Sequence, residues 1–334
     1  MGQTLSEPIT EKDTHEGQDE NFAYAVSSMQ GWRINMEDAH ATELSFGAQK
    51  HKHTQTYIWI CMYVSIYIYI YVYVYVYVYE YVYICICICI CIFLCICICT
   101  CICTSDRIYC ANAGDSRAML SVKGVEFPLS HDHKPTNPDE IKRIVAADGY
   151  VEFGRVRGNL ALSRAVGDFE FKTKPSLPAE EQMVTANPDI IEHALDKDVE
   201  FMVVACDGIW ECMTNQEVVT WVRDRLAIHQ PLTKICEDLM TKCLAKDSPS
   251  GPMFGCDNMT VCVVLFLHGG KSVQDVMLDI AKSSDLLAMK KQTKPPAISS
   301  REEGRVKMAP TATTLDEEEN KSDTVEKSEK AETS

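Results

Sequence analysis

The sequence has little positive charge. Its 334 residues include 32 Lys and Arg against 48 Asp and Glu, which gives a formal net charge of −16 at pH 7. Binding to nucleic acid relies on clustered Lys and Arg, so the sequence argues against DNA or RNA as the main partner. A divalent cation is not excluded, because carboxylate oxygens are ligands that such hard cations prefer.

The sequence also lacks the cysteine patterns of a disulfide or zinc protein. Ten of its 17 Cys lie between Cys61 and Cys103, and the other seven are scattered with no C-x-x-C pair among them. No His and Cys spacing typical of zinc is present. A basic segment followed by an apolar one, as in a secretory signal, is absent from the first residues. The sequence therefore predicts reduced cysteines in a cytoplasmic or nuclear protein.

The N-terminus carries a short lipidation pattern. Residues 1–6, MGQTLS, fit M-G-x-x-x-[ST], which makes Gly2 a candidate for myristoylation. The alternative is a chance match, because the pattern fixes few positions. One acyl chain binds membranes weakly, and the nearby Glu7, Glu11 and Asp13 supply no basic second signal. The expectation is at most a weak membrane association.

Residues 57–104 form an unusual apolar repeat. From Tyr67 to Thr104, Tyr or Cys alternates with Ile, Val or Thr, and only Glu80, Phe93 and Leu94 break the rule. Both faces of such a strand would be apolar, and the run far exceeds the usual length of about 3–10 residues. Codons for these residues can alternate pyrimidine and purine at every base, as a TA, TG and CA microsatellite does. We interpret the repeat as translated noncoding DNA, with a membrane anchor as the alternative.

The chain divides into three parts. Residues 1–22 predict a flexible N-terminus, residues 23–268 predict a domain interrupted at 57–104, and residues 269–334 predict an extension that is acidic and disordered from about 284. Apolar patterns predict strands within 22–28, 107–122, 200–208 and 254–266. Helices are predicted at 138–145, at 215–227 with Asn215 as N-cap, and after Pro231.

Four acidic pairs lie next to these predicted strands: Glu37-Asp38, Gly114-Asp115, Asp207-Gly208 and Asp257-Asn258. Asp207 and Asp257 adjoin strongly apolar strands, where a bare carboxylate is costly to bury. Carboxylates that converge from distant strands form an oxygen cage suited to Mg²⁺ or Mn²⁺. For any one acid the alternative is a turn residue, since Asp-Gly is a common turn dipeptide.

Six motifs occur in order over residues 27–264: SSMQGWRINMEDAH, ANAGDSRA, LSHDHKPTNPDEIKRI, GNLALSRAVGD, VVACDGIWE and GCDNMTV. In this order they resemble the metal-dependent serine/threonine protein phosphatases, the PPM or type 2C family. The resemblance lies on both sides of the repeat and excludes residues about 45–105 and the tail. It implies an α+β fold: an α-β-β-α sandwich of two mostly antiparallel sheets flanked by helices, in a monomer that acts on phosphorylated proteins.

The resemblance also implies a metal site and a reaction. Glu37, Asp207 and Asp257 match ligands of two Mg²⁺ or Mn²⁺ ions, and Asp115 matches an acid of a third, weaker metal position. Glu211 stands near that position, where many members carry Asp. In the family, water activated by the metals attacks the phosphorus of phosphoserine or phosphothreonine directly.

Two further residues match catalytic roles. Arg33 matches the arginine that grips the substrate phosphate, which suits the bidentate bonding of a guanidinium. Asp38 matches the acid that orients the metal-bound water. The resemblance therefore makes Arg33 and Asp38 the candidate catalytic residues.

One family motif, D-G-H-x-G, is missing. The only Asp-Gly pairs are Asp148-Gly149 and Asp207-Gly208, and neither precedes His. The missing Asp bridges the two metals in the family, and the repeat stands where this motif and the two following helices belong. The sequence therefore predicts a phosphatase with impaired metal occupancy and activity and with one helical layer incomplete. The alternative is a pseudophosphatase that keeps Arg33 and binds phosphoproteins without turnover.

Overall fold

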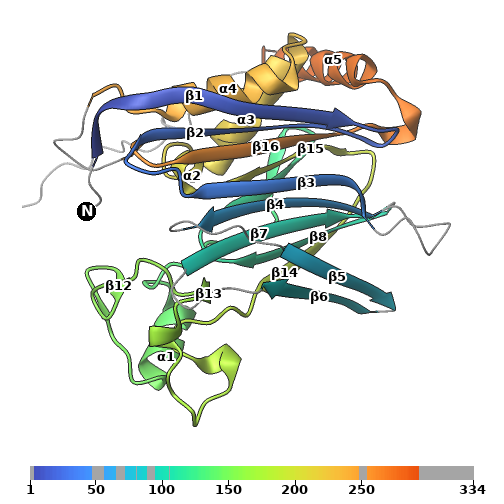
Figure 1. The fold of residues 1–334 in the computed structure, drawn as a ribbon. Helices are drawn as coiled ribbons and strands as arrows, with labels where there is room; N and C mark the ends of the chain where they lie inside the picture. The colour runs from blue at the N-terminus through green and yellow to red at the C-terminus, as the bar shows by residue number, and fades with distance from the viewer. Residues whose placement is uncertain are drawn as a thin grey trace, which may run out of the picture. The chain divides into compact units, whose positions relative to one another are not determined.

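The computed structural model describes residues 4–46, 56–64, 72–79, 81–88, 95–104, 106–247 and 254–292. All but Gln292 belong to one unit of the chain, Met1–Lys291. Two six-stranded sheets dominate this unit, one above the other in Figure 1. The first sheet has the order β1-β2-β16-β15-β9-β10, and the second has β14-β8-β7-β4-β3 with β13 beside β7.

The strands of the first sheet are β1 (Thr4–Gln18), β2 (Phe22–Arg33), β9 (Arg117–Val122), β10 (Val125–Pro128), β15 (Val199–Ala205) and β16 (Met259–Phe266). The second sheet holds β3 (Asp38–Phe46), β4 (Thr56–Val64), β7 (Cys95–Cys103), β8 (Arg107–Ala113), β13 (Val166–Gly167) and β14 (Asp189–Ala194). Two separate hairpins are β5 (Val72–Tyr79) with β6 (Tyr81–Ile88), and β11 (Val151–Glu152) with β12 (Arg155–Val156). Neighbouring strands within both sheets are antiparallel, as predicted.

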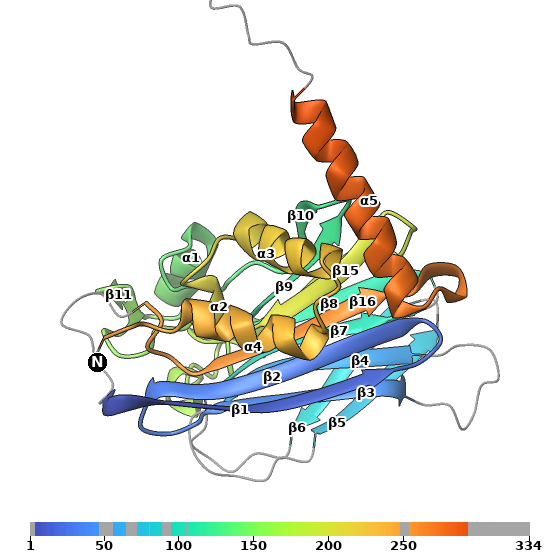
Figure 2. The ribbon, with the colours of Figure 1, turned by 90° about the horizontal axis from the view of Figure 1, so that it is seen from above.

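The helices are α1 (Pro138–Ala146), α2 (Asp207–Trp210), α3 (Asn215–Ala227), α4 (Leu232–Cys243) and α5 (Val273–Gln292). Figure 2 shows α3 and α4 lying over the first sheet. Their apolar faces share a core with that sheet, in which Val222 and Leu239 pack with strand residues such as Val203. The helices therefore cover the outer face of the first sheet.

A second core fills the space between the sheets. Val26, Leu120 and Val264 of the first sheet meet Cys99 and Cys101 of the second. Alternate residues of a strand point to one face, so Cys99, Cys101 and Cys103 of β7 enter this core together. Cysteine behaves there as a small apolar side chain.

The described parts of the repeat form strands, in keeping with its period of two. β4 and β7 pair with each other in the middle of the second sheet, and β5 and β6 form a hairpin. None of the described helices is both long and apolar enough to cross a bilayer. The origin of the repeat in noncoding DNA remains a prediction.

The expected flexible N-terminus is wrong for residues 4–18. This segment is β1, which pairs with β2 along most of its length. The hydroxyl of Thr14 also lies 2.7 Å from that of Ser27 and donates to Glu237 of α4 at 3.2 Å. Pairing with a buried neighbour therefore orders a polar segment. Gly2 lies outside the described residues.

The predicted helices at 138–145, 215–227 and after Pro231 are confirmed as α1, α3 and α4. The N-cap of α3 is Thr214 rather than Asn215, because Thr214 and Glu217 form a capping box. Disorder from about 284 is wrong as far as Gln292, since α5 continues to that residue. The residues after 292 lie outside the described part of the chain.

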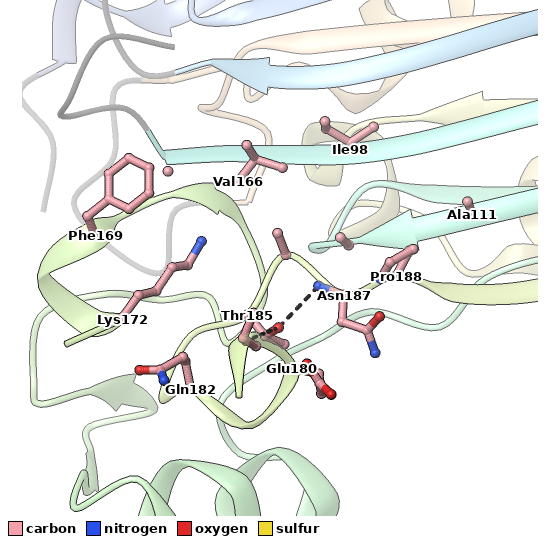
Figure 3. Close-up of a pocket in the computed structure, with 14 residues that line it drawn as sticks. Ile98, Ala111, Val166, Phe169, Lys172, Glu180, Gln182, Thr185, Asn187 and Pro188 are labelled. Atoms are coloured by element: carbon pink, nitrogen blue, oxygen red, sulfur yellow. Dashed lines mark hydrogen bonds between the residues drawn. The ribbon is translucent and has the colours of Figure 1, made fainter. Parts of the chain in front are cut away.

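The outer face of the second sheet borders a cavity of about 830 Å³, shown in Figure 3. Ile98, Ala111 and Val166 line it from the sheet, and the segment of residues 169–188 lines the rest. That segment contains only two short 3₁₀ turns, η1 (Phe169–Phe171) and η2 (Ala179–Glu181), among its helical elements. This cavity fits the expectation of an incomplete helical layer on one sheet.

Candidate metal centre

The predicted site residues gather where several strands begin or end. Arg33 is the last residue of β2, and Asp38 is the first residue of β3. Asp207 opens α2 two residues after the end of β15, and Asp257 stands two residues before β16. β2, β15 and β16 are adjacent in the first sheet, so residues far apart in sequence meet at one edge.

Arg33 and Asp257 form a bidentate ion pair. The Nε and Nη2 atoms of Arg33 donate to Oδ1 and Oδ2 of Asp257 at 2.8 and 2.7 Å. The side chains are 27% and 19% exposed, so the pair is only partly shielded from water. The guanidinium expected to bind phosphate therefore contacts the carboxylate expected to bind metal.

Asp38 is a buried acid with one unsatisfied oxygen. Its Oδ2 accepts a hydrogen bond from the hydroxyl of Thr260 at 2.7 Å, whereas Oδ1 has no hydrogen-bond partner. Burial raises the pKa of Asp38 to about 6, although the nearby Cys206 thiol and the hydrogen bond from Thr260 lower it. An orphaned buried carboxylate oxygen is costly, and a nearby cation would satisfy it.

Asp207 is buried among other acids of the site. Burial raises the pKa of Asp207 well above its ordinary value, and the charges of Asp115, Asp257 and Asp38 raise it further. The pKa of Glu211 is also raised, first by burial and then by Asp257 and Asp115, against the opposing charge of Lys134. Asp207 and Glu211 therefore lie near Asp115 and Asp257, whose charges disfavour their ionisation.

Lys134 is a functional residue that the sequence reasoning missed. Its Nζ donates a hydrogen bond to Oδ2 of Asp115. Burial lowers the pKa of Lys134, but the charge and hydrogen bond of Asp115 outweigh burial and raise it above its ordinary value. The lysine offsets part of the acidic charge. Its place in the motif LSHDHKPTNPDEIKRI was the available signal.

Asn258 is a second missed residue, and it organises the loop that carries Glu37. Its Oδ1 accepts from the backbone N–H of Glu37 at 2.8 Å. Its Nδ2 donates to the carbonyls of Gln30 and Asn35 at 2.8 and 3.0 Å. The amide therefore fixes residues 30–37 beside Asp257. Its position directly after Asp257 in GCDNMTV was the available signal.

Gly208 allows the backbone of α2 to lie very close to the backbone of Asn258. A Cβ atom at this position would lie 2.1 Å from the carbonyl oxygen of Asn258, which no side chain can tolerate. This approach brings the segment of Asp207 against the segment of Asp257. The packing of these two segments therefore requires glycine at position 208, the second residue of α2.

The oxygen donors and the orphaned Asp38 Oδ1 fit Mg²⁺ or Mn²⁺. The acids are spread more widely than the shell of a single ion. In the described part of the chain, the one group of three ligand atoms within 4.8 Å of one another is Cys99, Cys101 and Cys110 in the core. A single cation would bind these carboxylates only if they moved closer together.

Known proteins resemble this chain in sequence. A family model described as Protein phosphatase 2C matches residues 95–250. Protein phosphatase 2C homolog 2 of Schizosaccharomyces pombe is 42% identical over 295 residues, covering 80% of this chain and 80% of that protein. Its namesake in Hypocrea jecorina is 42% identical over 311 residues, covering 84% of this chain and 70% of that protein.

A solved structure has the same fold. Serine-threonine phosphatase 2C from Toxoplasma gondii superposes with a TM-score of 0.56 at 14% identity. The match covers 80% of this chain and 100% of that chain. At this low identity the likeness concerns the fold alone, and it agrees with the predicted sandwich of antiparallel sheets.

Proposed function

This chain belongs to the protein phosphatase 2C family, and from that premise we propose that it hydrolyses phosphoserine and phosphothreonine in proteins with Mg²⁺ or Mn²⁺. The observation that carries the proposal is the group of mutually repelling acids around Asp207, together with the orphaned Oδ1 of Asp38. Such a group is costly unless a cation joins it.

We assign two Mg²⁺ or Mn²⁺ ions to Glu37, Asp207 and Asp257, and a third, weaker position to Asp115, near which Glu211 stands. When bound, Mg²⁺ or Mn²⁺ lowers the pKa of a water molecule and neutralises charge on the phosphate. Asp38 would orient that water through its orphaned Oδ1, while Thr260 holds Oδ2. The rigid hydrogen bond to Thr260 makes Asp38 suited to this orienting role.

Arg33 would bind the phosphate of the substrate. Its two donors now contact Asp257, and a phosphate offers the same spacing of acceptor oxygens. Binding of a cation by Asp257 would free the guanidinium for this exchange. Cation binding and phosphate binding are therefore expected to support each other.

A second candidate function is binding of phosphoproteins without turnover. The absence of an Asp-Gly-His motif from the sequence favours it, because fewer carboxylates would then hold two cations close together. We therefore propose that activity of this chain is impaired.

The test measures three quantities on the purified full chain. Calorimetry gives Mn²⁺ binding, fluorescence anisotropy gives binding of a phosphothreonine peptide, and phosphate release gives hydrolysis. We expect Mn²⁺ binding and slow hydrolysis, with both lost in Asp257→Asn. Peptide binding without hydrolysis would favour the binding module. Rapid hydrolysis, typical of an intact two-metal site, would contradict impairment.

Three expectations remain predictions. We propose residence in the cytoplasm or nucleus, a monomeric state, and weak membrane association through a myristoylated Gly2. Mass spectrometry of the N-terminal peptide from the expressed protein measures the acyl group directly. An unmodified Gly2 in a cell with an active N-myristoyltransferase would contradict the last of these.

A further inference from the structure

Two cysteines contact each other beside the acidic site. Cys212 follows Glu211 directly, and Cys243 is the last residue of α4. Cys243 belongs to the apolar core over the first sheet, and Cys212 packs against that core. The Sγ of Cys212 also lies 3.5 Å from the carbonyl oxygen of Cys243 and 3.3 Å from that of Gly208. The thiol of Cys212 therefore lies against the residue that carries the second thiol.

Cys212 is reachable from solvent. Among the cysteines whose side chains the structure describes, it is the one that is not buried. It lines an open cleft of about 490 Å³, together with Trp210 and Glu211. Cys243 is only 6% exposed and lies behind it. A small oxidant in the cleft therefore meets Cys212 before Cys243.

The segment after α4 keeps Cys243 in place. The backbone N–H of Ala245 donates to the carbonyl of Gly255 at 2.9 Å. A Cβ atom on Gly255 would lie 2.2 Å from the carbonyl oxygen of Cys243. The end of α4 is thus packed against residues 255–256, and Cys243 is held as a fixed partner for Cys212.

We propose that a hydroperoxide converts Cys212 and Cys243 into a reversible disulfide. The sulfur of Cys212 attacks one peroxide oxygen, the O–O bond breaks, and Cys212 becomes a sulfenic acid with release of water or alcohol. The sulfur of Cys243 then attacks the sulfur of Cys212, the S–OH bond breaks, and the departing hydroxide takes the Cys243 proton to form water. A dithiol reductant restores both thiols.

The test maps the disulfide in the full reduced chain after treatment with stoichiometric hydrogen peroxide. Remaining thiols are blocked with N-ethylmaleimide, and the protein is digested with trypsin. We expect the peptide of residues 198–223 linked to that of residues 243–246, and the link disappears after dithiothreitol. Because the first peptide also contains Cys206, fragmentation must place the bond at Cys212.

Variants separate the roles of the two cysteines. Cys212→Ser and Cys243→Ser should both abolish the link, and Cys243→Ser should leave Cys212 as a sulfenic acid that dimedone labels. Cys236→Ser, which removes a buried thiol elsewhere in α4, should retain the link. A link from Cys212 to Cys256, or peroxide oxidation that spares Cys212, would overturn the proposal. The wild-type map decides this even where a variant folds poorly.

Discussion

Single acidic residues in this protein work against its own stability. Asp207 lies among Asp38, Asp115 and Asp257, and burial together with these charges raises its pKa. An acid whose pKa is raised on folding costs stability as the pH rises from its unfolded pKa through its folded pKa. At neutral pH the metal-free site is therefore a source of strain, which a bound cation would relieve.

Replacing Asp207 by Asn is expected to have opposite effects with and without metal. In EDTA the variant should melt at a higher temperature than the wild type, because one repelling charge is gone. With Mn²⁺ it should gain little, because a ligand is gone, whereas the wild type should gain several degrees. Differential scanning fluorimetry at pH 7.5 measures both.

The matched control is Asp224→Asn, which removes an exposed acid on α3. It should leave both melting temperatures close to those of the wild type. A lower melting temperature of Asp207→Asn in EDTA would mean that the carboxylate stabilises the metal-free fold, contrary to this account.

Glu140 is also a buried acid, but its pKa is lowered on folding rather than raised. Burial alone would raise its pKa, but hydrogen bonds from Arg143 and Arg164 outweigh burial and lower the pKa to about 2. The ion pairs are 2.7 and 2.8 Å long, and Glu140 is 3% exposed. Its ionised form therefore stabilises the fold, by an amount on the order of 3 kcal/mol from the shift in pKa.

Glu140→Gln should lower the free energy of unfolding by up to about that amount at pH 7, since it leaves two buried guanidinium groups underpaired. The contribution is fully present above the unfolded pKa of 4.5 and is lost as the pH falls toward 2. Urea denaturation at pH 7 and pH 3 measures the difference, which should shrink at the lower pH. Glu180→Gln, at an exposed position, should change little at either pH.

At the scale of elements, the sequence predicted those whose own residues carry the signal. The apolar run before Asp207 predicts β15, and helical spacing predicts α3 and α4. β1 was missed because its residues are mostly polar and exposed, and its order comes from pairing with β2. A polar edge strand depends on its neighbour, which local patterns do not contain.

In the site, too, the sequence predicted which residues take part but not which of them pair. Motifs predicted the acids, and the structure brings them to one edge. The pairing of Arg33 with Asp257, and of Lys134 with Asp115, could not be read from motifs. These contacts join residues 224 and 19 positions apart in the chain. They depend on the registers of several strands, which only the folded chain fixes.

Gly208→Ala tests how closely α2 must approach the loop before β16. The added methyl group would push α2 away from the carbonyl of Asn258 and so separate Asp207 from Asp257. We expect weaker Mn²⁺ binding by calorimetry and a lower melting temperature. Gly269→Ala is the control, because a Cβ there meets nothing within 4 Å, although its φ of +69° carries some strain. Unchanged Mn²⁺ affinity in Gly208→Ala would show that the spacing is not required.

For the whole molecule, the repeat poses a topological problem. β4 and β7 lie between β3 and β8 in the second sheet, and Asp38 at the start of β3 pairs with Tyr63 of β4. Removing residues 57–104 would leave β3 without a neighbour in that sheet. It would also remove Cys99, Cys101 and Cys103 from the core between the sheets. A functional protein without the repeat therefore needs other residues in both strand positions.

This requirement sharpens the prediction about the gene. If the repeat is translated noncoding DNA, the spliced message across the codons of Phe46 to Tyr109 should lack it. That message should instead encode two strands of about eight or nine residues with apolar alternate positions, and an Asp-Gly-His motif. Sequencing the mature transcript measures this directly. A mature message that retains the tract would contradict the prediction, and the chain would then have to hold its cation without the bridging aspartate. In that case, binding of phosphoproteins without turnover becomes the better account of its function.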